Sequence, residues 1–478
     1  MKKLLVAAVG LVTVLAAFPV YAVDVNFSGE FRVRAFWDDN LFDGNSSTDD
    51  SSRFADLRFR LKTAIKAGVT TGVVVLDFTN CSPGSDVSSF QNGTTPAIPF
   101  PPIPFPPGTA QTGNCRFGSA GFGNSYNVVG IREAYLHIDL TRLGLYLGRQ
   151  TIKVGHGIVL DSTADAITVV LPMGSTTVTA SMLQVADLND AAPTGSVFPN
   201  GVGINQDTTV WLVNVGMDRG SHLINLYDAF LYDQSPGTNN GATMYPTMPL
   251  ALGAPLTAYF PGVNKLWVNY LGVSLDAKSG PLALALEGSY DFGDAEQGPG
   301  ATDVRLNGWN LMGDVTTDAG GAKLGGTVVY AAGKSPSATG SGTVSDISGN
   351  FQLGNILLNN EQYSDRDGGS LGGGLNGAGI FAVKLHADMM PTEKLDLSGA
   401  VIYAQTAAVP CAGCNNRQIG YELDANAKYN VDDNMAFYAG AGYLITGSGA
   451  ADFYNNFNAT TGSNSNIWKL SAKAVFTF

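Results

Sequence analysis

The sequence predicts an all-β protein that folds as a transmembrane antiparallel β-barrel of about 18 strands. Three observations lead to this prediction. Short segments of alternating apolar and polar residues recur from one end of the chain to the other. Short turns and long connections separate these segments in alternation, as the short periplasmic turns and long extracellular loops of such barrels do. The chain also ends in a segment with one wholly apolar face.

The final segment, residues 466–478, has the clearest alternation. One parity carries Trp468, Leu470, Ala472, Ala474, Phe476 and Phe478. The other parity carries Lys469, Ser471, Lys473 and Thr477, with Val475 as an exception. Since successive side chains of a strand point to opposite faces, this is a two-faced strand. Its length suits a tilted membrane crossing, which takes roughly 9–11 residues.

The same pattern places further strands along the chain. We expect them near 25–37, 55–67, 69–80, 127–140, 143–154, 164–171, 175–186, 207–217, 221–233, 264–276, 281–292, 304–316, 321–332, 377–390, 393–405, 418–430 and 434–446. The two faces are hard to separate in 221–233, 264–276 and 304–316. A barrel of about 16 strands therefore remains the alternative.

The N-terminus carries an export signal. Lys2 and Lys3 precede an apolar run, and small residues close the stretch at Ala22. This layout predicts a cleaved secretory signal peptide over residues 1–22, while an uncleaved membrane helix is the alternative. No linker or shift in composition divides residues 23–478, so we expect one barrel domain there.

The composition excludes several classes of function. The formal net charge is −13 at pH 7, which argues against nucleic acid as a partner. The four histidines belong to no local motif for catalysis or metal binding. We therefore expect no enzyme activity, no metal and no cofactor.

Four cysteines remain in a chain that the signal peptide would export, where disulfides can form. The spacing favours the pairs Cys81–Cys115 and Cys411–Cys414, although four cysteines allow three connectivities. Between the first two lies a proline-rich run, residues 95–108. We expect this loop to cap the barrel or to fold inward, with an exposed tip as the alternative. Whether it or the connection 333–376 narrows the barrel stays open.

A sheet in a bilayer must close on itself, because hydrocarbon offers no partners to backbone groups. Closure puts the apolar parity outside and leaves a lumen too wide for side chains alone to fill. The last strand then joins the first two, and their inward charged residues form one wall. Its basic residues, here called the basic ladder, are Arg32, Arg34, Arg58, Arg60, Lys62, Lys469 and Lys473. Its acidic residues are Glu30 and Asp56. Such a ladder concentrates anions, unless carboxylates from inward loops neutralise it.

The signal peptide, the alternating strands and the ending Ala474-Val475-Phe476-Thr477-Phe478 resemble the porins of the Gram-negative outer membrane. That resemblance implies that Phe476 and Phe478 belong to the signal read by the barrel-assembly machinery. It also implies surroundings of outer-membrane lipid and lipopolysaccharide. The stretch Arg132–Leu140 and the step Leu147-Gly148-Arg149-Gln150 are more narrowly similar to the alginate-export-like and related 18-stranded porins.

The sequence thus predicts an outer-membrane channel for passive diffusion of small hydrophilic solutes, with a bias toward anions. Three alternatives remain: an export conduit for an anionic polymer, a structural or adhesive barrel with a loop-filled lumen, and a barrel enzyme with histidine and acid groups at its outer rim. The resemblance leaves both a homotrimer, common among general porins, and a single barrel open. Trp37, Tyr135, Tyr403, Tyr429 and Trp468 are candidates for interfacial aromatic girdles.

Overall fold

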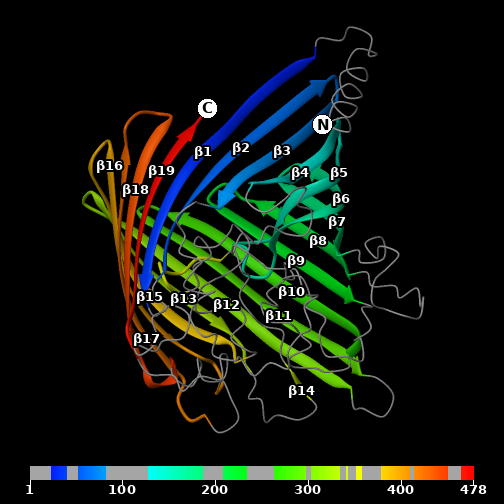
Figure 1. Ribbon diagram of the computed structural model, residues 1–478. Helices are drawn as coiled ribbons and strands as arrows, with labels where there is room; N and C mark the ends of the chain where they lie inside the picture. The colour runs from blue at the N-terminus through cyan, green and yellow to red at the C-terminus, as the bar shows by residue number, and fades with distance from the viewer. Residues whose placement is uncertain are drawn as a thin grey trace, which may run out of the picture.

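A computed structural model describes residues 23–39, 52–81, 127–186, 208–233, 263–297, 303–333, 341–342, 351–357, 378–409, 414–450 and 465–478. The predicted signal peptide, residues 1–22, and the proline-rich run lie outside these ranges. The described residues form a tilted barrel of strands (Figure 1). No helix among them is both long and apolar enough to cross a membrane.

The described residues form one sheet of nineteen strands. Their bounds are β1 Asp24–Asp39, β2 Ser52–Ala67, β3 Thr70–Cys81, β4 Asn127–Leu140, β5 Leu143–Lys153, β6 Asp161–Met173, β7 Thr176–Ala186, β8 Thr208–Asp218, β9 His222–Asp233, β10 Val263–Ser279, β11 Leu282–Gln297, β12 Val304–Ala319, β13 Ala322–Ala331, β14 Ser341–Gly342, β15 Ile380–Thr392, β16 Leu395–Gln405, β17 Gln418–Asn430, β18 Met435–Thr446 and β19 Ile467–Thr477. β4 and β17 have the predicted bounds, and the other long strands begin and end within a few residues of theirs.

Eighteen of these strands close the barrel, because β14 has only two residues and pairs beside β12. The long strands pair antiparallel with their neighbours in chain order, and β1 pairs with both β2 and β19. In Figure 1 the red β19 lies beside the blue β1 at this closing seam. The prediction of an antiparallel barrel of about 18 strands is confirmed, and the alternative of 16 is wrong.

Short turns join the strands at one end of the barrel, where both ends of the described chain also lie. Gly68 and Gly280 begin two of these turns with φ angles of 60° and 58°. Such left-handed backbone conformations are open to glycine without strain. The connections at the opposite end include all the long ones, such as 82–126. We call the two ends the short-turn end and the long-loop end.

The outer surface is apolar, as the alternation predicts. On β1 the exposed large apolar side chains are those of one parity, for example Phe27, Phe31 and Trp37. Aromatic pairs cross neighbouring strands on this surface, such as Trp309–Tyr330 with ring centroids 4.2 Å apart and Tyr403–Tyr421 at 5.1 Å. An apolar band edged by aromatic side chains is the surface that a membrane barrel presents to lipid.

Tyr135 does not belong to this surface. It pairs with Val73, which is 5% exposed on the inner face of β3. Its ring lies 6.1 Å from that of Tyr146, which stacks on His137. The assignment of Tyr135 to a girdle is therefore wrong, because its parity turns it into the barrel.

The inner face differs from a uniformly polar lumen. Toward the long-loop end its side chains are apolar and fully buried in one cluster, for example Leu231 on β9, Leu266 and Val268 on β10, and Leu306 on β12. Apolar residues on both parities explain why the faces of these three strands could not be separated in the sequence. Apolar side chains can be buried on the inner face only if another part of the chain lies in the lumen and covers them.

Candidate functional site

Strands β19, β1 and β2 bring the basic ladder together on one inner wall. Arg34 pairs with Lys473 across β1 and β19, and Arg32 pairs with Arg58 across β1 and β2. Arg32, Arg34, Arg58 and Lys469 are at most 7% exposed, whereas the side chain of Lys62 is exposed to the lumen. Residues that lie more than 400 positions apart in the chain thus form one surface, because the barrel closes there.

Carboxylates of the wall itself neutralise part of this ladder. Arg58 Nη2 donates to Glu30 Oε1 at 2.6 Å. Arg60 makes a two-pronged contact to Asp77 on β3, through Nε at 2.5 Å and Nη2 at 2.8 Å. Arg132 Nη1 lies 4.0 Å from the same carboxylate. Two arginines of the ladder are therefore paired with carboxylates of the wall itself.

Asp77 was not predicted among the lumen residues, although its position in the alternation of β3 indicates that it faces the lumen. Leu76 and Phe78 flank it, and residues of their parity face outward on β3, as the exposed Val74 does. The carboxylate between them must face the lumen. Asp56, which we predicted as a lumen acid, lies on β2 opposite Arg34, but its side chain is outside the described part of the structure.

Aromatic rings hold other cations of the wall. Lys469 Nζ and Arg34 Cζ lie 5.5 Å and 5.2 Å from the ring centroid of Phe36. Lys473 Nζ lies 4.4 Å from the ring of Tyr438 on β18, and Lys428 Nζ on β17 lies 5.9 Å from it. Cations over ring faces gain electrostatic attraction while they keep their charge. The basic surface therefore continues from β1 to β17.

Two of the described segments lie inside the barrel. Lumen segment 154–160 connects β5 and β6, and its residues Ile158, Val159 and Leu160 are fully buried. Lumen segment 351–357 belongs to the connection between β13 and β15, and Ile356 and Leu357 are buried as completely. Both contribute to the buried cluster on the inner face. They supply the cover that the apolar inner side chains require.

The wall leaves room for these segments. On β18 a Cβ at Gly442 would lie 2.9 Å from Cβ of Asn355 and 3.1 Å from Ile356. Asn355 also donates through Nδ2 to the carbonyl of Ala441 at 2.8 Å. A side chain at Gly442 would push lumen segment 351–357 off the wall, so glycine there permits the close approach.

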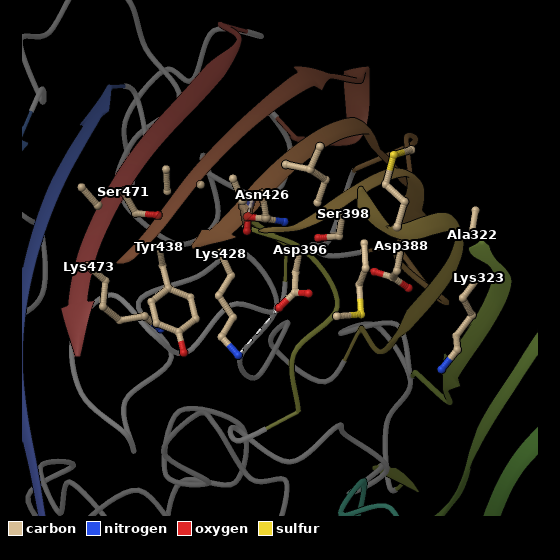
Figure 2. A pocket seen from close by; sticks show the side chains of 18 of the residues that line it. Ala322, Lys323, Asp388, Asp396, Ser398, Asn426, Lys428, Tyr438, Ser471 and Lys473 are labelled. Carbon is tan, nitrogen blue, oxygen red and sulfur yellow. Dashed lines mark hydrogen bonds and ion pairs between the residues drawn. The ribbon is translucent and has the colours of Figure 1, made fainter. Parts of the chain in front are cut away.

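A cavity of about 800 Å³ lies in the lumen beside lumen segment 351–357 and reaches the short-turn end. We call it the vestibule. Figure 2 shows Lys473, Tyr438 and Lys428 on one side and Asp388 and Lys323 on the other. Asp396 stands between them, with Oδ2 3.8 Å from Nζ of Lys428. Arg34 of the ladder and the neighbouring Phe36 also line the vestibule, so its walls combine charged groups with apolar and aromatic side chains.

The two phenylalanines of the predicted assembly signal lie away from the lumen. Phe476 and Phe478 are 43% and 45% exposed on the outer surface. Cys81 ends β3, and Cys414 is disulfide-bonded. Cys115 and Cys411 lie outside the described residues, so both predicted pairings stay predictions, as does the assembly role of the two phenylalanines.

Comparisons with known proteins agree on the fold. No protein-family model and no curated protein sequence matches the chain. Among solved structures, OccK9 (OpdG) of Pseudomonas aeruginosa is 11% identical with a TM-score of 0.54, over 95% of this chain and 98% of that one. A BenF-like porin from Pseudomonas fluorescens Pf-5 is 10% identical, also with a TM-score of 0.54 and the same coverage. OpdK of P. aeruginosa with vanillate is 9% identical, with a TM-score of 0.51 over 95% and 98% of the two chains.

These matches are to Occ, Opd and BenF-like porins, so they lend no support to the narrower resemblance to alginate-export-like porins. At such identities these matches support the fold alone, which agrees with the closed barrel and its apolar outer band. The chain has the fold of the 18-stranded porins of the Gram-negative outer membrane.

Proposed function

We propose that the chain is an outer-membrane channel through which small hydrophilic solutes diffuse passively, with a preference for anions. The observation that supports this most is the continuity of the basic ladder with the vestibule through Arg34 and Lys473. Cations along a narrow low-dielectric passage raise the local concentration of anions. No chemical step is needed for this function.

The charge pattern supports a bias rather than strict selection. Glu30 and Asp77 offset Arg58 and Arg60, and Asp396 stands beside Lys428. Arg34 and Lys469 lie against the ring of Phe36, Lys473 lies against the ring of Tyr438, and Lys62 is exposed. One similar structure, OpdK, was determined with vanillate, a small carboxylate, which is consistent with passage of small anions.

The zero-current potential across a planar bilayer under a salt gradient tests the preference. We expect wild-type protein to favour the anion, and the double variant Arg34→Ala, Lys473→Ala to lose most of that preference. Arg305→Ala is the matched control, since Arg305 has an 83% exposed side chain and lies on the parity of Trp309, outside the lumen. Equal potentials for wild type and double variant would contradict a role of the basic ladder in the anion preference.

The second candidate is a structural barrel with a filled lumen. The fully buried apolar cluster and the two lumen segments at the long-loop end favour it. The same segments narrow the lumen, which makes an export conduit for a bulky polymer the less suitable alternative. Folded protein that never conducts would favour the structural barrel over the channel.

A further inference from the structure

Both lumen segments are attached to the wall through backbone N–H groups, and in both the acceptor is a buried glutamate. Glu287 on β11 is 3% exposed and accepts hydrogen bonds from the backbone of His156, at 2.5 Å, and of Ile158. Glu422 on β17 is fully buried and accepts hydrogen bonds from the backbone of Ile356 at 2.6 Å and Leu357 at 2.8 Å. The same arrangement, a buried glutamate that accepts hydrogen bonds from two backbone N–H groups, thus occurs on two different walls of the barrel.

The attachment of lumen segment 351–357 is balanced in charge. Asp424 accepts a hydrogen bond from Asn355 N at 3.2 Å. Lys384 on β15 donates to the carbonyl of Leu353 at 2.7 Å, and Lys469 on β19 donates to that of Asn355 at 2.9 Å. Two carboxylates therefore accept from backbone N–H groups of the segment, and two ammonium groups donate to two of its backbone carbonyls. Buried backbone groups need such partners, which a strand would obtain from its ladder.

Lumen segment 154–160 has a second support. Tyr227 on β9 donates its hydroxyl to Glu287 Oε1 at 2.8 Å, which leaves Oε2 to the backbone of His156. The tyrosine ring lies over Gly272, where any side chain would collide with it. The carboxylate is thus oriented by one residue and binds the segment with its other oxygen.

We propose that Glu422 and Glu287 are positioning residues that set the width of the channel by holding the two segments in the lumen. This inference rests on the proposed function. Removal of a glutamate leaves two backbone N–H groups without an acceptor in a buried, largely apolar place. That loss favours a segment position in which water can satisfy them. The lumen then widens on that side.

The inference divides the basic ladder into two roles. Lys469 and Lys473 lie on the same face of β19, four residues apart in the chain. Lys469 is 4% exposed and binds lumen segment 351–357, whereas Lys473 lines the vestibule. Lys469 therefore belongs with the glutamates that hold the segment, and Lys473 with the charges that solutes meet.

Single-channel conductance of the reconstituted full chain tests the role of Glu422. We expect Glu422→Ala to conduct more than wild type. Glu422→Gln should lie between them, because the amide oxygen still accepts one hydrogen bond while its NH2 group opposes the other donor. The matched control is Glu296→Ala, which removes a glutamate on the outer parity of β11 that contacts Lys265. We expect no gain of conductance from it. Heat-modifiable mobility on gels reports that each variant keeps a folded barrel.

Replacement of residues 351–357 by a glycine–serine linker tests whether Glu422 acts through the position of this segment or through its own charge. We expect the replaced chain to conduct as Glu422→Ala does, and the added Glu422→Ala change to have no further effect there. A conductance of Glu422→Ala equal to that of wild type, while the linker variant conducts more, would overturn the positioning role. If neither wild type nor the linker variant conducts, the proposed function fails instead.

The two lysines give an independent test that keeps side-chain length. Lys469→Met should raise conductance and leave the anion preference nearly unchanged. Lys473→Met should lower the anion preference and leave conductance nearly unchanged. The opposite assignment, or equal effects of the two variants, would contradict the division of roles, even if Glu422→Ala failed to fold.

Discussion

The ring of Phe478 lies nearly parallel to that of Phe59 on β2, with centroids 6.1 Å apart and an interplanar angle of 13°. Between these two residues runs β1, whose Gly29 exchanges both backbone hydrogen bonds with Phe478, at 2.9 Å and 3.2 Å. The last residue of the chain therefore spans the seam that closes the barrel. Its contact reaches beyond the neighbouring strand to the next one.

Deletion of Phe478 should lower the amount of inserted barrel more than the conductance of each inserted channel. The deletion removes two hydrogen bonds and an aromatic contact worth roughly 0.5–1.5 kcal/mol beyond its burial, but no residue of the lumen. Quantitative blotting of outer membranes and single-channel recording measure the two effects. Normal insertion with altered conductance would contradict this account of the seam.

Asp77 should reduce the anion preference that the basic wall produces. Asp77→Asn removes the carboxylate shared by Arg60 and Arg132, so we expect a stronger anion preference in zero-current potentials. The change also breaks a largely buried charge-assisted pair, so the unfolding free energy should fall by about 1–3 kcal/mol. Asp294→Asn on the outer parity of β11 serves as the control, and an unchanged or weaker anion preference in Asp77→Asn would count against the prediction.

Asp228 places a carboxyl group on the outer, lipid-facing surface. It shares a parity on β9 with Leu226, which is 48% exposed, and it pairs with Val213 on β8 and Leu271 on β10, which are 48% and 46% exposed. A carboxylate in such a position is unfavourable in lipid. Asp228→Leu should therefore raise the unfolding free energy in bilayers by roughly 1–2 kcal/mol, with Asp228→Asn between the two. A loss of stability in urea titrations would indicate that this carboxylate has a partner in the membrane.

The strands could be predicted because a single requirement, the alternation of an outer apolar and an inner polar parity, determines their sequence pattern. Lipid requires an apolar outer parity everywhere, so the alternation and the turn residues locate β4 and β17 to the residue. The rule weakens where the inner face is also apolar, as at Leu266 and Val268 on β10. It also fails at Gly420, where the register shifts between β16 and β17. Ile419 beyond this point is buried, although the alternation put it on the outer parity.

The site was predicted less completely. Membership of the basic ladder follows from parity and closure, but the pairing of Arg60 with Asp77 depends on how β2 and β3 are registered. No rule of alternation tells which connection enters the lumen. The run Ile158-Val159-Leu160 is a usable signal, because three apolar residues in a connection need cover. Residues 351–357 offer no comparable signal, and their hold on Glu422 appears only in three dimensions.

The most direct test of the channel itself is the ion current through purified, folded protein in a planar lipid bilayer. The account predicts discrete, long-lived conductance steps that appear without any energy source, since solutes pass down their own gradient. Protein that shows the heat-modifiable mobility of a closed barrel but never carries current would contradict it.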